Sequence, residues 1–173
     1  KLIKHFDINA ITHLKTNPTI TDNWLKGPLF NALKESEGVI NFTGEPIADK
    51  RWTDKNCREI ENSRIHTTEN LINAMDRLKK PPELLINSSA IGYYGTSQLL
   101  SFNEDSQSGE DFLALLCRKW EEVAFKKPKR TRLIIFRIGI VLGPDGGALG
   151  KMLPIFRSGL GGSIGNGKQW MSW

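Results

Sequence analysis

The 173-residue sequence has little of what would mark a secreted or membrane protein. It contains only two cysteines, Cys57 and Cys117, which are too few for a framework of disulfide bonds and indicate a reducing, cytoplasmic setting. No run of about 18 apolar residues occurs, so no membrane span is expected. The first residues, KLIKHFDINA, are not typical of a secretory signal, and no initiator methionine begins the sequence, so we expect part of a longer chain.

Patterns for binding metal or nucleic acid are also missing. The three histidines, His5, His13 and His66, are too far apart for a recognisable metal site, and no acidic cluster has ligand spacing. The net charge of +5 is scattered along the chain, apart from KKPKR at residues 126–130. We interpret that run as a solvated loop between a helix and a strand. We therefore predict no metal and no nucleic-acid partner.

The composition, 39% hydrophobic and 25% charged, is ordinary for one globular domain. The apolar pattern predicts helices over residues 22–36, 53–80, 109–125 and 147–160, and strands over 38–42, 83–89 and 131–143. The last strand shows no polar alternation until Arg137, so we expect it to be central and buried on both faces. Alternating helices and strands indicate βαβ units and a parallel sheet covered by helices.

Glycine and small polar residues follow each of the three predicted strands. The segments are NFTGEP, NSSAIGYYG and RIGIVLGPDGG. Glycines can serve simply as tight turns between strand and helix, but three such segments in succession favour a site. In open parallel sheets, ligands bind beyond the carboxyl ends of the strands. We therefore expect the functional site at this edge.

The segments VINFTGEPIADKRW, NSSAIGYYG, FRIGIVLGPDGGALGKMLPIFRSGLGG and IGNGKQWMSW resemble the extended short-chain dehydrogenase/reductases. The subfamily is epimerase-like, often labelled NAD-dependent epimerase/dehydratase or, in bacteria and plastids, SulA-type cell-division inhibitor. The resemblance runs from about residue 22 to the last residue. It implies a Rossmann-type doubly wound parallel sheet with helices on both faces.

Two parts that the resemblance implies are missing from the sequence. No Gly-x-x-Gly-x-x-Gly turn for a cofactor pyrophosphate occurs, and no substrate-binding region follows Trp173. We therefore expect residues 1–173 to be the central part of a single NAD(P)-binding domain. Residues from about 150 to 173 would begin its substrate side.

The resemblance also implies a set of cofactor contacts. It assigns them to Phe42, Thr43, Gly44, Glu59, Arg64, Ser88, Arg137 and Ile140. Simpler interpretations are a tight turn at Thr43 and Gly44, a surface pair for Glu59 and Arg64, and core packing for Ile140. The resemblance favours NADP, with NAD as the alternative.

The catalytic residues implied by the resemblance follow the second predicted strand. Ser89 matches the serine that hydrogen-bonds the reacting oxygen of the substrate, where negative charge develops. Tyr94 and Tyr93 are the candidate proton donors. The alternative is a strand end whose serines cap a turn.

One departure from the family pattern concerns the proton relay. A standard member carries Tyr-x-x-x-Lys on the next helix, where the lysine charge favours the ionised tyrosine. Here Phe112 and Leu116 stand nearest to those places, and no Tyr-x-x-x-Lys occurs in the sequence. Three alternatives remain open: a tyrosine of the neighbouring loop supplies the proton, Cys117 or Lys119 has moved into the site, or the protein binds cofactor without turnover.

The last segment, GNGKQWMSW, matches the start of the family's substrate side. Gln169, Trp170 and Trp173 would then line the substrate cleft. Lysines and arginines such as Lys151 could meet an anionic substrate, although a solvated surface charge is the simpler interpretation. Residues 1–173 give no indication of an oligomeric state.

Three functions are compatible with these observations. The first is an NAD(P)-dependent oxidoreductase or epimerase acting on a hydroxyl-bearing small molecule such as a nucleotide sugar. The second is a catalytically degenerate, NADP-binding regulator linked to cell division. The third is an interaction domain, which the three glycine-rich strand ends disfavour.

Overall fold

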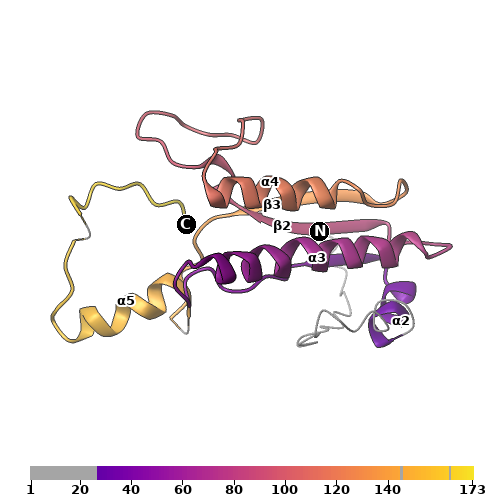
Figure 1. The fold of residues 1–173 in the computed structure, drawn as a ribbon, viewed down its shortest axis with the longest axis horizontal. Helices are drawn as coiled ribbons and strands as arrows, with labels where there is room; N and C mark the ends of the chain where they lie inside the picture. The colour runs from indigo at the N-terminus through magenta and orange to yellow at the C-terminus, as the bar shows by residue number, and fades with distance from the viewer. Residues whose placement is uncertain (1–26, 145, 164) are drawn as a thin grey trace, which may run out of the picture.

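A parallel sheet of three strands forms the centre of the computed structural model, which describes residues 27–144, 146–163 and 165–173 (Figure 1). The strands are β1 (Gly38–Asn41), β2 (Leu84–Ala90) and β3 (Arg132–Ile138), in the order β1-β2-β3. Ile40, Ile86 and Ile134 lie side by side in register. This register brings the carboxyl ends of all three strands to one edge of the sheet.

Within the described part of the chain, four α-helices and one short 3₁₀-helix accompany the strands. They are α2 (Pro28–Glu35), α3 (Asp54–Asp76), η1 (Ile91–Tyr94), α4 (Phe112–Ala124) and α5 (Gly147–Arg157). Two of them begin at a side-chain cap: Thr53 Oγ1 accepts a hydrogen bond from the Asn56 amide at 3.3 Å, and Asp111 Oδ1 accepts one from the Ala114 amide at 2.9 Å. Such caps pair amide groups that have no partner within the helix.

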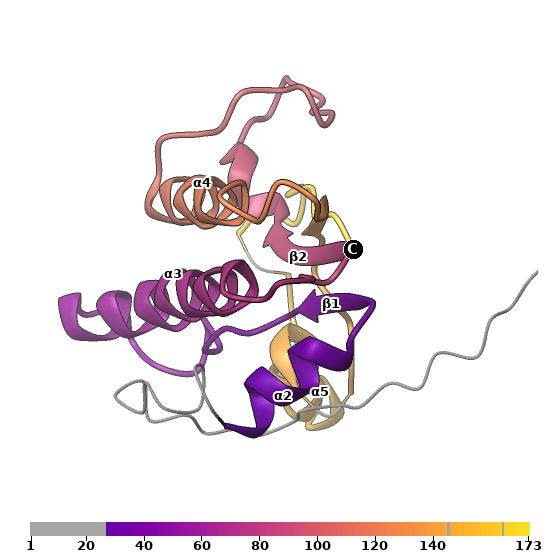
Figure 2. The same ribbon diagram turned by 90° about the vertical axis from the view of Figure 1, so that its right-hand side faces the viewer.

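Helices α3 and α4 pack against each other on one face of the sheet (Figures 1 and 2). Leu71 and Met75 of α3, Leu85 of β2 and Val123 of α4 are buried in the same core, together with Leu33 of α2. On the opposite face of the sheet, Ile40 is 56% and Phe136 is 47% exposed. The predicted architecture, a parallel sheet with flanking helices, is confirmed.

The strand predicted at 131–143 is shorter than predicted, and within the described sheet it is not the central strand. β3 ends at Ile138 and is an edge strand of the described sheet, with no fully buried residue. β2 is the central strand. The following backbone leaves the sheet, and the Ile140 amide donates to the Ser172 carbonyl at 2.9 Å instead. An apolar run indicates a strand but does not fix its place in the sheet.

The helix boundaries differ from the predicted ones by a few residues. Pro28 occupies the first turn of α2. A backbone N–H there has no partner within the helix, so proline, which lacks this N–H, costs no hydrogen bond at this position. The first residues of the helix predicted over 22–36, including Asp22, lie outside the described residues. Helix α3 ends at Asp76, four residues before the predicted end, and α4 begins at Phe112, three residues after the predicted start. No helix in the described ranges is both long and apolar enough to cross a membrane.

Candidate functional site

A buried polar network fixes the end of β1. The Asn41 amide group donates from Nδ2 to Asn87 Oδ1 at 2.7 Å and to Thr68 Oγ1 at 3.0 Å, which also accepts from Trp120 Nε1 at 2.8 Å. Asn41 Oδ1 in turn accepts from both the amide and the hydroxyl of Thr43, at 3.2 and 2.6 Å. The network therefore holds the turn that contains Thr43 and Gly44. Phe42, just before it, is 60% exposed.

Arg64 holds the loop after β1 against α3. Its Nη2 donates to the Glu45 carbonyl at 3.0 Å and its Nη1 to the Ile60 carbonyl at 3.1 Å. The guanidinium lies over the ring of Trp120, 5.4 Å from its centre, and burial lowers the pKa of Arg64. A Cβ added at Gly44 would lie 2.8 Å from Arg64 Cζ. Arg64 thus makes a structural contact at the predicted cofactor turn.

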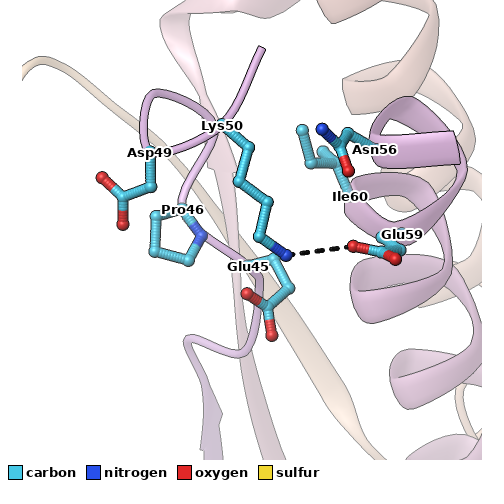
Figure 3. Close-up of a pocket in the computed structure, with 7 residues that line it drawn as sticks. All are labelled: Glu45, Pro46, Asp49, Lys50, Asn56, Glu59 and Ile60. Atoms are coloured by element: carbon cyan, nitrogen blue, oxygen red, sulfur yellow. Dashed lines mark hydrogen bonds and ion pairs between the residues drawn. The ribbon is translucent and has the colours of Figure 1, made fainter. Parts of the chain in front are cut away.

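Figure 3 shows a small pocket of about 110 Å³ between this loop and α3. Its lining residues are Glu45, Pro46, Asp49, Lys50, Asn56, Glu59 and Ile60. Lys50 Nζ lies 3.1 Å from Glu59 Oε2, and this bond raises the pKa of Lys50 (Figure 3). Three acidic residues and one lysine line this pocket, so its excess of negative charge does not suit a pyrophosphate. Glu59 pairs with Lys50, whereas the guanidinium of Arg64 binds backbone carbonyls.

The centre of the candidate site is Glu121 of α4, which the sequence analysis missed. Its side chain is buried, and Oε1 accepts from Ser89 Oγ at 2.6 Å and from Arg137 Nε at 2.9 Å. Its Oε2 accepts from Arg137 Nη2 at 2.9 Å. The hydrogen bonds to Glu121 raise the pKa of Arg137. An acidic residue beside Trp120 on the apolar face of a helix, and one arginine in an apolar strand, were the signals that could have revealed the pair.

Arg137 links this carboxylate to both tyrosines. Its Nη1 donates to Tyr94 Oη at 2.9 Å and to the Glu104 carbonyl at 3.0 Å. The guanidinium also lies over the ring of Tyr93, 3.5 Å from its centre, which is a close cation–π contact. Four of the predicted site residues, Ser89, Tyr93, Tyr94 and Arg137, therefore lie together at the ends of β2 and β3.

The two candidate catalytic hydroxyl groups differ in access. Ser89 is 3% exposed, and its hydroxyl donates to Glu121. Tyr94 is half-buried and lines an open hollow of about 520 Å³. The other lining residues carry no charge: Thr96, Ser97, Leu100, Ser101, Phe102, Ser106, Gln107 and Ser108. A small molecule can reach Tyr94 from this side without any movement of Ser89.

Cys117 and Lys119 of α4 were the two candidates to replace the lysine of the family pattern. Neither of them places a charged group in the cluster around Glu121. Cys117 is buried beside Ser89, and burial raises the pKa of its thiol, so the thiol stays neutral. Lys119 is exposed and donates to Glu61 at 2.7 Å, on the neighbouring helix α3. Phe112 packs edge-on against Trp52, 5.5 Å between ring centres.

The remaining predicted residues occupy three settings. Ser88 is buried, and its carbonyl accepts from Asn87 Nδ2 at 2.8 Å. Ile140 is half-buried and pairs through its amide with Ser172. Trp170 and Trp173 are 93% and 82% exposed. Neither hollow described above is lined by Trp170, Trp173 or Gln169.

Charged side chains elsewhere form pairs rather than ligand sets. Lys151 of α5 pairs with Asp49 at 2.9 Å and donates to the Ala48 carbonyl. Within residues 27–144, 146–163 and 165–173, no three histidine, cysteine or acidic side chains gather as metal ligands.

A parallel sheet with flanking helices and a polar cluster at the carboxyl ends of its strands defines a Rossmann-type α/β fold. No protein-family model matches the sequence. The chain is 43% identical over 145 residues to the epimerase family protein SDR39U1 homolog, chloroplastic, of Arabidopsis thaliana, covering 83% of this chain and 42% of that protein.

Two solved structures are similar over the same share of the chain. The human epimerase family protein SDR39U1 (isoform 2), crystallised with NADPH, gives a TM-score of 0.75 at 36% sequence identity. The match covers 83% of this chain and 52% of that protein's chain. The nucleoside-diphosphate sugar epimerase of Corynebacterium glutamicum gives a TM-score of 0.67 at 29% sequence identity, and the match covers 30% of that protein's chain. The chain spans about half the length of the curated relatives it matches. These similarities support the resemblance to the extended, epimerase-like short-chain dehydrogenase/reductases.

Proposed function

We propose that this chain is the central part of an NADP-dependent oxidoreductase or epimerase of the extended short-chain reductase type. Its substrate would be a hydroxyl-bearing small molecule, with nucleotide sugars as the first class to test. The observation that carries the proposal is the cluster of Ser89, Tyr94, Arg137 and Glu121 at the carboxyl ends of β2 and β3. Relatives named as epimerases, one of them crystallised with NADPH, support it.

Phe42, Thr43 and Gly44 would contact the cofactor. These three residues are exposed and directly follow the end of β1. The acidic pocket beside Lys50 does not fit the pyrophosphate, so we assign no diphosphate contact within it. When bound, the nicotinamide would exchange a hydride with a carbon of the substrate.

The residues of the cluster would act on the substrate oxygen. Tyr94, which faces the open hollow, would exchange the proton, with Tyr93 as the second candidate. Ser89 would hold the reacting oxygen, and for this its hydroxyl would have to leave Glu121 or accept a hydrogen bond. Gln169, Trp170 and Trp173 would line the substrate side, and Glu59, Arg64, Ser88 and Ile140 would support the cofactor side.

A second function, an NADP-binding regulator without turnover, is favoured by one observation. The Ser89 hydroxyl is buried and already donates to Glu121, as in a structural contact. The relatives reported above are not named for cell division, so the link to that process rests on the sequence resemblance alone. The cytoplasmic location likewise stays a prediction, and the Arabidopsis relative is named chloroplastic.

Titration of the full-length protein with NADPH and with NADH tests the cofactor. Tryptophan-to-nicotinamide energy transfer reports binding, and the sequence holds five tryptophans. Tight binding of NADPH supports the proposal. If neither nucleotide binds, both the proposed enzyme and the alternative regulator are contradicted. In the enzyme, Ser89→Ala should abolish turnover and leave NADPH affinity within about twofold, because a hydrogen bond to the reacting oxygen acts mainly in the transition state. Loss of binding together with turnover would instead identify a structural serine.

A further inference from the structure

The structure places a cation next to a tyrosine, although the sequence lacks the Tyr-x-x-x-Lys pair. Arg137 Nη1 lies 2.9 Å from Tyr94 Oη. The two residues come from different elements, β3 and η1, and are 43 positions apart in the sequence. No spacing rule for a single helix could have found them. A positive charge at this distance stabilises negative charge on the phenol oxygen, which is the task of the lysine in the standard pair.

We propose that Tyr94 is the proton donor of this protein and that Arg137 takes the place of the missing lysine, an inference that rests on the proposed function. Glu121 is the positioning residue that fixes Arg137. The three residues form a chain from buried carboxylate to guanidinium to phenol, and the phenol alone lines the open hollow.

The direction of the hydrogen bonds supports the assignment. Arginine has only donors, so Tyr94 Oη must accept from Arg137. The O–H of Tyr94 then remains available to donate to a substrate oxygen. The Ser89 hydroxyl, in contrast, already donates its hydrogen bond to the Glu121 carboxylate, which is paired with Arg137. Tyr94 is thus the donor that the cluster offers as it stands, whereas Ser89 could donate to a substrate oxygen only after its hydroxyl leaves Glu121.

The contacts also distinguish the two tyrosines. Tyr93 lies with its ring face under the guanidinium, 3.5 Å from its centre, and does not line the hollow. The Tyr94 ring stacks on Phe102 at 5.2 Å between ring centres, and both residues line the hollow. Tyr93 therefore helps to seat Arg137, whereas Tyr94 meets the substrate.

Glu121 fixes the orientation of Arg137 by a bidentate contact. Nε and Nη2 bind the two carboxylate oxygens, both at 2.9 Å, so the guanidinium plane cannot turn and Nη1 stays directed at Tyr94. The raised pKa of Arg137 agrees with a guanidinium that keeps its charge throughout.

The proposed step balances as follows for reduction of a carbonyl group. The O–H bond of Tyr94 breaks, and its proton forms the new O–H bond on the carbonyl oxygen. The electron pair stays on the phenol oxygen, next to Arg137. The carbonyl carbon accepts a hydride from a reduced nicotinamide, and water returns a proton to Tyr94. Oxidation of the alcohol runs through the same transfers in reverse.

The test uses the full-length protein and five variants. Tyr94→Phe removes the proposed donor, and Tyr93→Phe removes the hydroxyl group of the second candidate while keeping the ring under Arg137. Arg137→Lys keeps the charge, and Arg137→Gln removes it. Because Arg137→Gln leaves the buried Glu121 without its partner and can unfold the protein, the double variant Glu121→Gln with Arg137→Gln removes both charges at nearly constant volume.

The first readout needs neither cofactor nor turnover. In ultraviolet resonance Raman spectra, the intensity ratio of the paired tyrosine ring bands reports whether a phenol oxygen accepts a hydrogen bond. The difference between wild type and Tyr94→Phe isolates Tyr94. We expect an acceptor signature in wild type that is lost in the double variant. An unchanged Tyr94 signature in the double variant overturns the Tyr94–Arg137 contact.

The second readout is NADPH-dependent reduction of 9,10-phenanthrenequinone, a small dicarbonyl probe, alongside NADPH affinity. Tyr94→Phe should lower kcat by roughly 10²-fold or more, as loss of a general acid does, with NADPH affinity unchanged. Arg137→Lys should retain more activity than Arg137→Gln, and Tyr93→Phe should lose less activity than Tyr94→Phe, because the Tyr93 hydroxyl does not donate in the proposed step. Equal loss in both tyrosine variants, or none in Tyr94→Phe, overturns the proposal.

Failure of the proposed function and failure of the proposed role of Tyr94 give different results. If NADPH does not bind the wild-type protein, the proposed function is wrong, whatever the Raman spectra show. If NADPH binds and the quinone is not reduced, the regulator is favoured and the role of Tyr94 as proton donor is wrong.

Discussion

Glu121 and Arg137 form a two-pronged ion pair in which the guanidinium donates to both carboxylate oxygens at 2.9 Å. The side chains are 6% and 18% exposed, so the pair is largely shielded from water. The charges come from α4 and β3, and the pair fastens the helix to the edge strand. Breaking a shielded pair leaves one charge buried alone, which costs far more than the pair itself contributes.

Removing the charge of Glu121 should therefore destabilise the protein. We expect Glu121→Gln to lower the free energy of unfolding by about 3–5 kcal/mol, because Arg137 keeps its charge without its partner. The matched control is Glu122→Gln, since the Glu122 side chain is 64% exposed and pairs with Arg118 of its own helix. The control should change by less than about 0.5 kcal/mol. Urea unfolding measures both, and equal changes would contradict the pair's structural role.

Thr68 should prove sensitive to loss of its hydroxyl group. Its fully buried Oγ1 accepts from Asn41 Nδ2 and Trp120 Nε1, so Thr68→Val leaves two buried donors unpaired. At about 1–3 kcal/mol for each unpaired N–H group, the loss should be roughly 2–6 kcal/mol in the free energy of unfolding. Thr68→Ser keeps the hydroxyl and should retain most of the stability. A valine variant as stable as the serine variant would show that the network contributes little.

Gly109 should not tolerate a side chain, because the chain closes tightly there. Its amide donates to the Tyr93 carbonyl at 2.8 Å, and an added Cβ would lie 2.9 Å from Gly95 Cα and 3.0 Å from the Tyr94 carbonyl. Backbone atoms cannot move aside cheaply, so Gly109→Ala should cost about 1–3 kcal/mol.

The control for Gly109 is Gly162→Ala, where an added Cβ would meet no atom within 4 Å. Alanine there reduces the freedom of the unfolded chain, so stability should stay unchanged or rise by up to about 1 kcal/mol. Thermal unfolding of both variants decides the matter. Because the loop that Gly109 closes holds Tyr94, Gly109→Ala should also reduce turnover, whereas Gly162→Ala should not.

Cys117 should make stability depend on pH in the alkaline range. Burial raises the pKa of its thiol in the folded state above the ordinary value of about 8.5. At pH values between the pKa of the unfolded state and that of the folded state, the folded state therefore binds more protons than the unfolded state. The free energy of unfolding should therefore fall as pH rises above about 8.5. Urea unfolding at several pH values measures the slope, and Cys117→Ala should reduce it. An equal slope in both proteins would show that other groups cause it.

The order of the elements could be predicted from local sequence. Thr53 begins α3 as predicted, and apolar runs located β1 and β2 to within about a residue. The glycine-rich segments after the strands lie at one edge of the sheet, as expected, because parallel strands place their carboxyl ends together. The resemblance further supplied Ser89, Tyr93, Tyr94 and Arg137, which do lie together.

Partners between distant elements could not be predicted in this way. Glu121 was missed because an acidic residue in a helix is usually solvated, and nothing in its own segment indicates that Arg137 lies above it. The edge position of β3 in the described sheet also depends on which strands pair, not on its apolar run. The sequence by itself determined the helices, the strands and the chemical groups near their ends, because these follow from local propensity and capping. Only the tertiary structure decided that one buried carboxylate orients Arg137 toward Tyr94, because that contact joins residues that are brought together by packing alone.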